Sequence, residues 1–176
     1  MTTQKHTSIL FSEAAIAKAV SKIAAQIEKD YRGKDLVVVG ILKGSFVFMA
    51  DLVRQINVPL QIDFIRAYSY GSGTSPTGPV RLVYKPQLPL RGRHVLLVED
   101  IVDTGATTAR VMEYVARKKA ASVKLCALLD KPSRRKVPVS ISYQGLSIPD
   151  VFVVGYGLDA AEAYRNLPYV AKVDGT

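Results

Sequence analysis

The chain has 176 residues, of which 48% are hydrophobic and 22% charged, and this balance is typical of one globular domain. The sequence excludes a membrane-spanning helix, which needs ~20 consecutive apolar residues, and an intrachain disulfide, because Cys126 is the single cysteine. The net charge of +9 favours a polyanionic ligand, either a nucleic acid or a small polyphosphate.

Predicted helices and strands alternate along the chain. Ser12 can cap a first helix, in which apolar residues recur at helical spacing. A continuous valine-rich run then predicts a strand that is buried on both faces. In chain order, the predicted elements are a helix at 13–29, a strand at 36–42, a helix at 46–53, strands at 60–68, 80–84 and 95–98, a helix at 105–119, and strands at 123–129, 151–154 and 170–173.

The alternation predicts an α/β fold with a mainly parallel, twisted sheet flanked by helices. Residues 69–79 are rich in Gly, Ser, Thr and Pro, which predicts a mobile loop between two strands of a hairpin. In parallel sheets, ligands bind beyond the carboxyl ends of the strands. Several polar residues directly follow predicted strand ends and are therefore expected at one edge: Lys43, Glu99, Asp100, Lys131 and the turn at 155–159.

Glu99 and Asp100 are adjacent carboxylates at the end of an apolar run. Two such groups in a tight turn repel each other unless a cation or a hydrogen-bonding ligand compensates. Mg2+ or the diol of a sugar would do so. The alternative is an ordinary solvated turn, and acidic pairs alone do not distinguish the two.

The segment that follows, Asp103 to Thr108, predicts an anion site. Successive amide N–H groups at the start of a helix bind phosphate, and Gly105 permits a close approach of the backbone. Capping of the helix by Asp103 or Thr104 is an alternative that is compatible with phosphate binding. The glycine patterns of nucleoside-triphosphate and dinucleotide sites are absent. Together with the acid pair, the segment predicts a phosphorylated sugar as the ligand.

Five other residues are weaker candidates. Lys43 and Gly44 form a second strand-to-helix turn that can hold another anion. Lys131 is either a donor at the site or a solvated lysine in a basic turn. Phe152 is by default a core residue, although an aromatic ring at a strand end can stack on a base. Asp159 can ligate a metal or cap a helix.

These segments together resemble the type I phosphoribosyltransferases. Residues 95–108, Val-Leu-Leu-Val-Glu-Asp-Ile-Val-Asp-Thr-Gly-Ala-Thr-Thr, are similar to the phosphoribosyl-pyrophosphate signature of that family. Within the family, the resemblance is to the hypoxanthine-guanine (6-oxopurine) branch, and it extends over residues 36–168. The further matching segments are Leu42-Lys-Gly-Ser45, Ser69-Tyr70, Leu128-Leu-Asp-Lys131, Ile148-Pro-Asp150, Phe152-Val-Val-Gly-Tyr156, Leu158-Asp159 and Tyr164-Arg-Asn-Leu167.

The resemblance implies a single domain over residues 1–176, with a core at about 36–150. A small hood would come from residues 1–35 and 150–176, and a lid from residues 69–79. The implied reaction is a Mg2+-dependent purine salvage step, in which phosphoribosyl pyrophosphate and hypoxanthine or guanine give IMP or GMP and pyrophosphate. The alternatives are a xanthine-accepting enzyme and an RNA-binding regulator on the same fold.

The resemblance also implies residue roles. Asp103 would be the general base near purine N7, and the peptide bond between Leu42 and Lys43 would be cis. Phosphoribosyl pyrophosphate would be bound by Lys43, Gly44, Glu99, Asp100, Asp103, Thr104, Gly105, Ala106, Thr107, Thr108 and Arg165. The purine would be bound by Lys131, Phe152, Val153 and Asp159. Ser69 and Tyr70 would lie in the lid, and Glu99, Asp100 and Asp159 would hold magnesium.

The implied partners are phosphoribosyl pyrophosphate and a 6-oxopurine base, with no nucleic acid and no membrane. Members of the family associate, so we expect a homodimer or a homotetramer. A cytoplasmic location is the simplest expectation, with Cys126 in the hydrophobic core. The two basic clusters at 117–119 and 131–136 differ in expectation. The first suits a helix C-terminus, whereas the second follows a strand end and is expected to place at least one side chain at the site.

Overall fold

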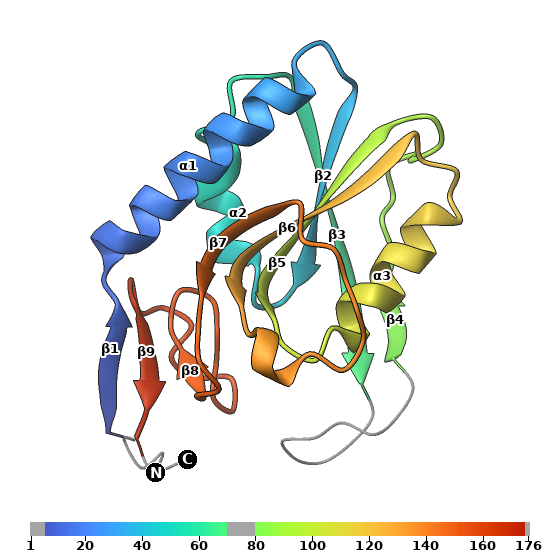
Figure 1. The fold of residues 1–176 in the computed structure, drawn as a ribbon. Helices are drawn as coiled ribbons and strands as arrows, with labels where there is room; N and C mark the ends of the chain where they lie inside the picture. Colours follow the sequence, from blue (N-terminus) through green and yellow to red (C-terminus); the bar gives the residue numbers. More distant parts are fainter. Residues whose placement is uncertain (1–5, 70–79, 175–176) are drawn as a thin grey trace.

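A six-stranded sheet with the order β4-β3-β2-β5-β6-β7 forms the centre of the molecule (Figure 1). The computed structural model describes residues 6–69 and 80–174. Five strands run parallel, and edge strand β4 (Val80–Tyr84) pairs antiparallel with its neighbour. The parallel strands are β2 (Leu36–Leu42), β3 (Leu60–Ser69), β5 (His94–Val102), β6 (Ser122–Asp130) and β7 (Tyr143–Ser147). The predicted α/β class with a mainly parallel sheet is confirmed.

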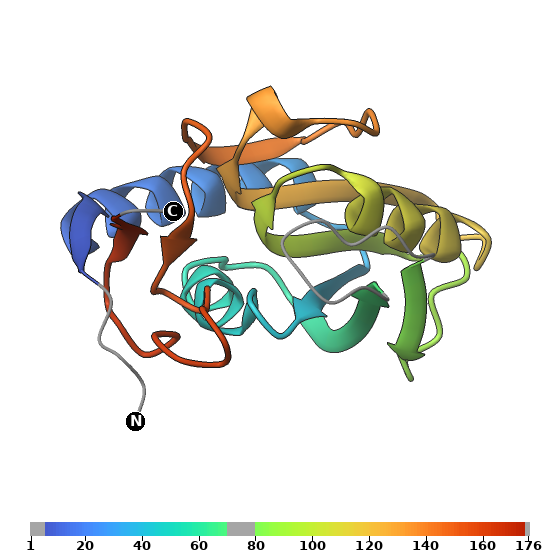
Figure 2. The ribbon, with the colours of Figure 1, turned by 90° about the horizontal axis from the view of Figure 1, so that it is seen from below.

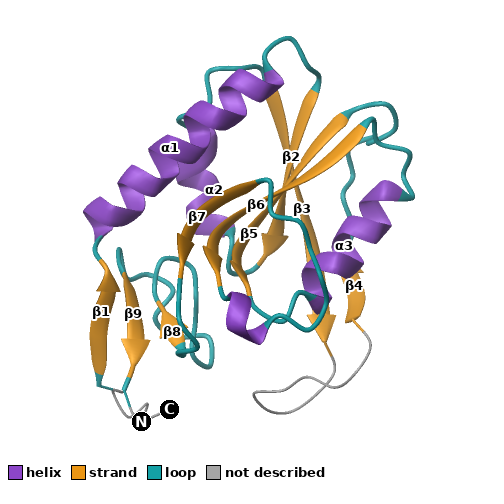
Figure 3. Cartoon of the chain, viewed as in Figure 1, coloured by secondary structure: helices purple, strands orange, loops and turns teal. Residues whose placement is uncertain are grey.

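Helices cover both faces of this sheet (Figure 3). Helices α1 (Glu13–Tyr31) and α2 (Phe46–Val53) pack on one face, and α3 (Ala106–Ala116) packs on the other. Alternate residues of the central strands therefore enter two different cores. Ser12 begins α1 as predicted, because its hydroxyl accepts a hydrogen bond of 3.3 Å from the amide of Ala15.

A second, three-stranded antiparallel sheet joins the two ends of the chain. Its order is β1-β9-β8, and it is built from β1 (Thr7–Phe11), β8 (Val153–Val154) and β9 (Val170–Val173). It lies beside the lower end of the main sheet in Figure 1. We call it the hood. Helix α1, which we expected within the hood, packs against β7 and α2 and contributes buried residues to the main core.

Several predicted boundaries differ from the structure. β5 was expected to end at residue 98 but continues to Val102, because its ladder with β6 extends to the pair Val102 and Asp130. Glu99 and Asp100 therefore lie inside a buried strand, and the prediction that they form a tight turn after it is wrong. Helix α3 ends at Ala116, before the predicted end at Lys119, which has a φ of 59°. β1, β7 and the short 3-10 helix η1 (Pro132–Arg134) were not predicted.

Two further expectations concern the burial of Cys126 and the membrane-spanning helix. Cys126 is fully buried in the core, as predicted, and burial raises the pKa of its thiol, which stays neutral. Over the parts of the chain that the structure describes, no helix has the length and apolar character to cross a membrane.

Candidate active site

The carboxyl ends of the parallel strands meet at one edge of the sheet, which Figure 2 shows from below. Val102 of β5 and Asp130 of β6 are directly paired at this edge. Asp103 is the first residue after β5, and Lys131 is the first residue after β6. The two residues therefore follow neighbouring strand ends at this edge of the sheet. The predicted general base and the predicted donor to the purine thus come from neighbouring strand ends, as the convergence argument required.

Glu99 and Asp100 are both buried, with 8% of each residue exposed. Burial raises the pKa of Glu99 well above its usual range, and the charge of Asp100 raises it further. Burial also raises the pKa of Asp100. Glu99 Oε2 has no hydrogen-bond partner among the described residues. A buried oxygen without a partner, next to a second carboxylate, fits Mg2+, which proteins bind through one or two carboxylates together with substrate phosphates.

A cavity of about 130 Å³ lies where β5 ends and α3 begins. Gly105 precedes α3 with a φ of +84°, and a Cβ there would lie 2.3 Å from the carbonyl oxygen of Val137. Thr104 makes only a long capping contact with α3, because its hydroxyl accepts a 3.4 Å hydrogen bond from the amide of Ala106. The cavity is lined by Glu99, Asp100, Ile101, Asp103, Thr104, Gly105, Thr107 and Thr108. All of these except Ile101 were predicted site residues.

Asp103 and Lys131 belong to a row of alternating charges. The Arg134 Nε atom lies 3.5 Å from Asp103 Oδ1, which is buried and has no hydrogen bond among the described residues. Arg134 Nη1 and Lys131 Nζ each lie 3.8 Å from Asp150 Oδ1. Lys131 is 4% exposed and donates a 2.8 Å hydrogen bond to the carbonyl oxygen of Val151. Lys131 is therefore not the solvated lysine of the alternative interpretation.

Phe152 and Val153 lie at the start of the hood. Phe152 precedes β8 rather than lying within a strand at 151–154, and it is 39% exposed, whereas Val153 is 6% exposed. The carbonyl oxygen of Phe152 accepts a 2.9 Å hydrogen bond from the amide of Val173 in β9. The exposure of Phe152 disagrees with its default assignment to the core and leaves its ring accessible to a ligand.

The turn after β2 brings cations close to the C-terminal segment. The Leu42–Lys43 peptide bond is cis, as the resemblance implied. Lys43 Nζ lies 3.0 Å from Glu162 Oε1, and Arg165 Nη2 lies 3.1 Å from Glu162 Oε2. These two cations hold the pKa of Glu162 below its usual range. The sequence analysis did not predict Glu162 as a site residue. The one available signal in the sequence was its position, three residues before Arg165.

Asp159 also faces Arg165, at 2.7 Å from Nη2, and accepts a 2.8 Å bond from the amide of Glu162. Within residues 6–69 and 80–174, no three His, Cys, Asp or Glu side chains form a metal-binding group. The assignment of Asp159 to magnesium and to the purine therefore stays a prediction. Ser69 is the last residue of β3, and Tyr70 lies outside the described residues.

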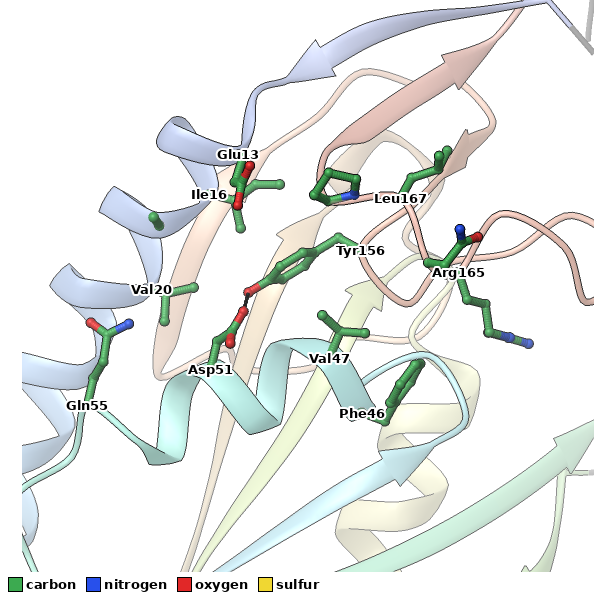
Figure 4. Close-up of a pocket in the computed structure, with 13 residues that line it drawn as sticks. Glu13, Ile16, Val20, Phe46, Val47, Asp51, Gln55, Tyr156, Arg165 and Leu167 are labelled. Carbon is green, nitrogen blue, oxygen red and sulfur yellow. Dashed lines mark hydrogen bonds between the residues drawn. The ribbon is translucent and has the colours of Figure 1, made fainter.

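A cavity of about 620 Å³ lies elsewhere, between α1, α2 and the turns after β8 (Figure 4). In its interior, the Tyr156 hydroxyl donates a 2.6 Å hydrogen bond to Asp51 Oδ2. Arg165 is the one predicted site residue in its lining, and Figure 4 shows the guanidinium pointing away from Tyr156. Glu99, Asp100 and the turn at residues 103–108, which we call the phosphate turn, do not line this cavity. We therefore place the site at the sheet edge instead.

Two arginines next to the site come from the basic cluster at 131–136. The sequence predicted that at least one member of this cluster faces the site. Arg134 does so, because its guanidinium lies beside the carboxylate of Asp103. Arg135 was not singled out, although it is bonded to the carbonyl oxygen of Asp103 at 3.0 Å. Its position in a basic run after a strand end was the available signal.

Comparisons with known proteins agree with the resemblance. Residues 6–161 match the phosphoribosyl transferase domain family. The hypoxanthine phosphoribosyltransferase of Salmonella typhimurium is 48% identical over 172 residues, which are 96% of this chain and 97% of that protein. The hypoxanthine-guanine phosphoribosyltransferase of Streptococcus pneumoniae is 46% identical over 162 residues, or 92% and 90% of the two chains. The crystal structure of a Staphylococcus aureus hypoxanthine phosphoribosyltransferase superimposes with a TM-score of 0.90 at 44% identity, covering 94% of this chain and 90% of that one.

Proposed function

The chain belongs to the phosphoribosyltransferase family, and from this membership we propose that it transfers the 5-phosphoribosyl group of phosphoribosyl pyrophosphate to N9 of hypoxanthine or guanine. The products are IMP or GMP and pyrophosphate, and the reaction serves purine salvage in the cytoplasm. Relatives with both names, hypoxanthine and hypoxanthine-guanine phosphoribosyltransferase, support a 6-oxopurine as the acceptor. The enzyme acts as a homodimer or homotetramer and takes no nucleic acid as a partner.

The observation that supports this proposal most directly is the placement of Asp103 and Lys131, which directly follow the paired residues Val102 and Asp130 at adjacent strand ends. Asp103 accepts the N7 proton while N9 attacks the ribose. Lys131 donates to the 6-oxygen, and it is poorly matched to the 6-amino group of adenine because both are donors. Phe152 stacks on the base, and the carbonyl oxygen of Val153 accepts from the amino group of guanine.

The remaining residues act on phosphoribosyl pyrophosphate. The turn from Asp103 to Thr108 binds the 5′-phosphate through backbone amides and hydroxyls, and Glu99 and Asp100 bind the ribose hydroxyls. Lys43, Gly44 and Arg165 bind the pyrophosphate and stabilise the negative charge that develops as it leaves. Mg2+, when held by Glu99 and Asp100 and by Asp159, would supply further charge neutralisation there. The lid predicted at residues 69–79, which would exclude water from the activated sugar, lies outside the described residues apart from Ser69.

The test is a panel of hypoxanthine, guanine, xanthine and adenine, each with phosphoribosyl pyrophosphate and with or without Mg2+. We expect nucleotide and pyrophosphate to form with hypoxanthine and guanine, only in the presence of Mg2+, and little product with adenine. Turnover of xanthine at a similar rate would support the xanthine-accepting alternative. Salt-resistant binding of RNA without turnover of any base would refute the proposal.

Replacing Lys131 with methionine is expected to lower kcat/KM for hypoxanthine by about 10- to 100-fold, since a hydrogen bond from a charged donor is worth about 1.5–3 kcal/mol. The preference over adenine should narrow in parallel. Steady-state kinetics with both bases measure the effect. Lys136→Met is the matched control, because Lys136 is an exposed lysine of the same basic cluster. An unchanged preference in Lys131→Met would contradict the assigned role.

The Glu162 carboxylate forms ion pairs with both cations that we assign to pyrophosphate, at 3.0 Å from Lys43 and 3.1 Å from Arg165. Glu162→Gln is therefore expected to lower the KM for pyrophosphate in the reverse reaction about two- to fivefold, a modest change because these ion pairs are exposed. Glu113→Gln is the control, since Glu113 bridges Arg110 and Arg117 on α3 in a similar way. A higher KM for pyrophosphate in Glu162→Gln would show that the carboxylate assists binding instead.

A further inference from the structure

Arg135 bonds to the ends of both strands that present Asp103 and Lys131. Its Nε donates a 3.0 Å hydrogen bond to the carbonyl oxygen of Asp103, and its Nη2 donates a 3.0 Å bond to that of Val102. The same guanidinium forms an ion pair with the carboxylate of Asp130, the residue before Lys131. The side chain is 17% exposed, so these contacts are largely shielded from water.

These contacts lie where the ladder between β5 and β6 ends. The amide of Lys131 donates a 3.0 Å bond to the carbonyl oxygen of Val102, which is also an acceptor for Arg135. Beyond this point β5 continues into the phosphate turn, and β6 continues into η1. The guanidinium therefore joins the two strand ends at the position where they begin to separate.

The residues that follow Arg135 contact the phosphate turn as well. The amides of Lys136 and Val137 donate bonds of 3.0 and 2.9 Å to the carbonyl oxygen of Thr104. A Cβ on Gly105 would lie 2.9 Å from Cδ of Arg135, so the stem of the arginine packs directly against the turn. Residues 135–137 thus fix the backbone of the turn from outside the cavity.

The two neighbouring arginines differ in what they contact. Arg134 lies near the carboxylate of Asp103 and near Asp150, and it is 31% exposed. Arg135 contacts the backbone of Asp103 and leaves the carboxylate free. The bonds described for Arg135 are therefore all to protein groups at the two strand ends.

We propose that Arg135 is a positioning residue that sets the spacing between the Asp103 carboxylate and the Lys131 ammonium, and thereby the register in which the purine is bound. The inference rests on the proposed function, in which these two groups address N7 and the 6-oxygen of one base. Arginine suits the role because its planar guanidinium presents several donors in a fixed geometry. Lysine keeps the charge but has a single nitrogen and cannot reach three acceptors on two strands together.

Arg135→Lys tests the proposal, with wild-type turnover of hypoxanthine measured first to establish the proposed function itself. We expect kcat/KM for hypoxanthine to fall about 10- to 100-fold, because small misplacements of catalytic groups have effects of this size. The KM for phosphoribosyl pyrophosphate should change less than about threefold, since the bonds from the amides of Lys136 and Val137 to the turn remain in this variant. Arg110→Lys, on the exposed surface of α3, is the matched control. Equal losses for both substrates would indicate a merely structural role and overturn the proposal.

A double-mutant cycle with Lys131→Met gives a second readout that a structural role would not move. If Arg135 acts by placing Lys131 and Asp103, Arg135→Lys should cost much less in the Lys131→Met background than in the wild type. Additive effects would refute the proposal. If Arg135→Lys does not fold, the pair Arg135→Gln with Asp130→Asn removes both charges and leaves none unpaired. The same split between the two substrates is then required of that variant.

Discussion

Replacing Asp103 with asparagine is expected to lower kcat for hypoxanthine by about 10²- to 10⁴-fold, the usual contribution of a general base. The side chain of asparagine has nearly the same shape as that of aspartate, but its amide cannot accept a proton at neutral pH. Its amide would also present a donor to the N7–H of the base, so two donors would face each other. Asp103 Oδ1 has no hydrogen bond among the described residues, so little structure depends on it. The fold should therefore survive the change.

Single-turnover and steady-state kinetics would measure this loss, with circular dichroism and the Tm to verify folding. Asp150→Asn is the control, because Asp150 is the other carboxylate beside Arg134, at 3.8 Å. It removes a charge from the same surroundings without removing the proposed base, and we expect less than about a tenfold effect. If Asp103→Asn turns over within a few fold of the wild type, Asp103 is not the base.

The second large effect is expected from Gly44→Ala. A Cβ at this position would lie 1.7 Å from Asp100 Oδ2, whereas nonbonded contacts of this kind start near 3.4 Å. The contact is with a buried carboxylate, so neither the turn nor Asp100 can yield cheaply. Because a misplacement of about 1 Å can cost 10²-fold in rate, we expect kcat/KM for phosphoribosyl pyrophosphate to fall by about 100-fold or more.

Gly92→Ala provides the comparison for Gly44→Ala. A Cβ on Gly92 meets no atom within 4 Å, although its φ of +74° makes alanine unfavourable there. That variant should lose some stability, about 1–2 kcal/mol, and keep its turnover. The opposite result for Gly44→Ala, near-normal kinetics in a folded protein, would show that the loop and Asp100 move apart at little cost.

The main sheet could be predicted because its signals are local. The buried run at 36–42 and the apolar run with the acidic pair in β5 are each readable within about ten residues of sequence. The expected convergence of Lys43, Glu99, Asp100, Lys131 and the turn at 155–159 then follows from a general property of parallel sheets. Their roles in the reaction came from the family resemblance, and they stay predictions until they are measured.

Other features depend on partners that are distant in sequence. β1 is half exposed and has no clear pattern, and it becomes a strand because Thr7 pairs with Val173 at the other end of the chain. The extent of β5 past residue 98 is set by its ladder with β6. The orientation of Arg135 follows from the same two strand ends. None of these pairings leaves a local trace in the sequence.

The order of strands in the hood makes the last strand of the chain hold Phe152, the residue that we propose to stack on the base. β9 is the middle strand, with β8 on one side and β1 on the other, and its Val173 amide holds the carbonyl oxygen of Phe152. Proteolytic trimming that removes residues 170–173 would leave the main sheet complete, yet Phe152 would lose its support. We therefore expect nicking near the C-terminus to weaken base binding and, because the buried Val170 belongs to the main core, to lower the Tm as well.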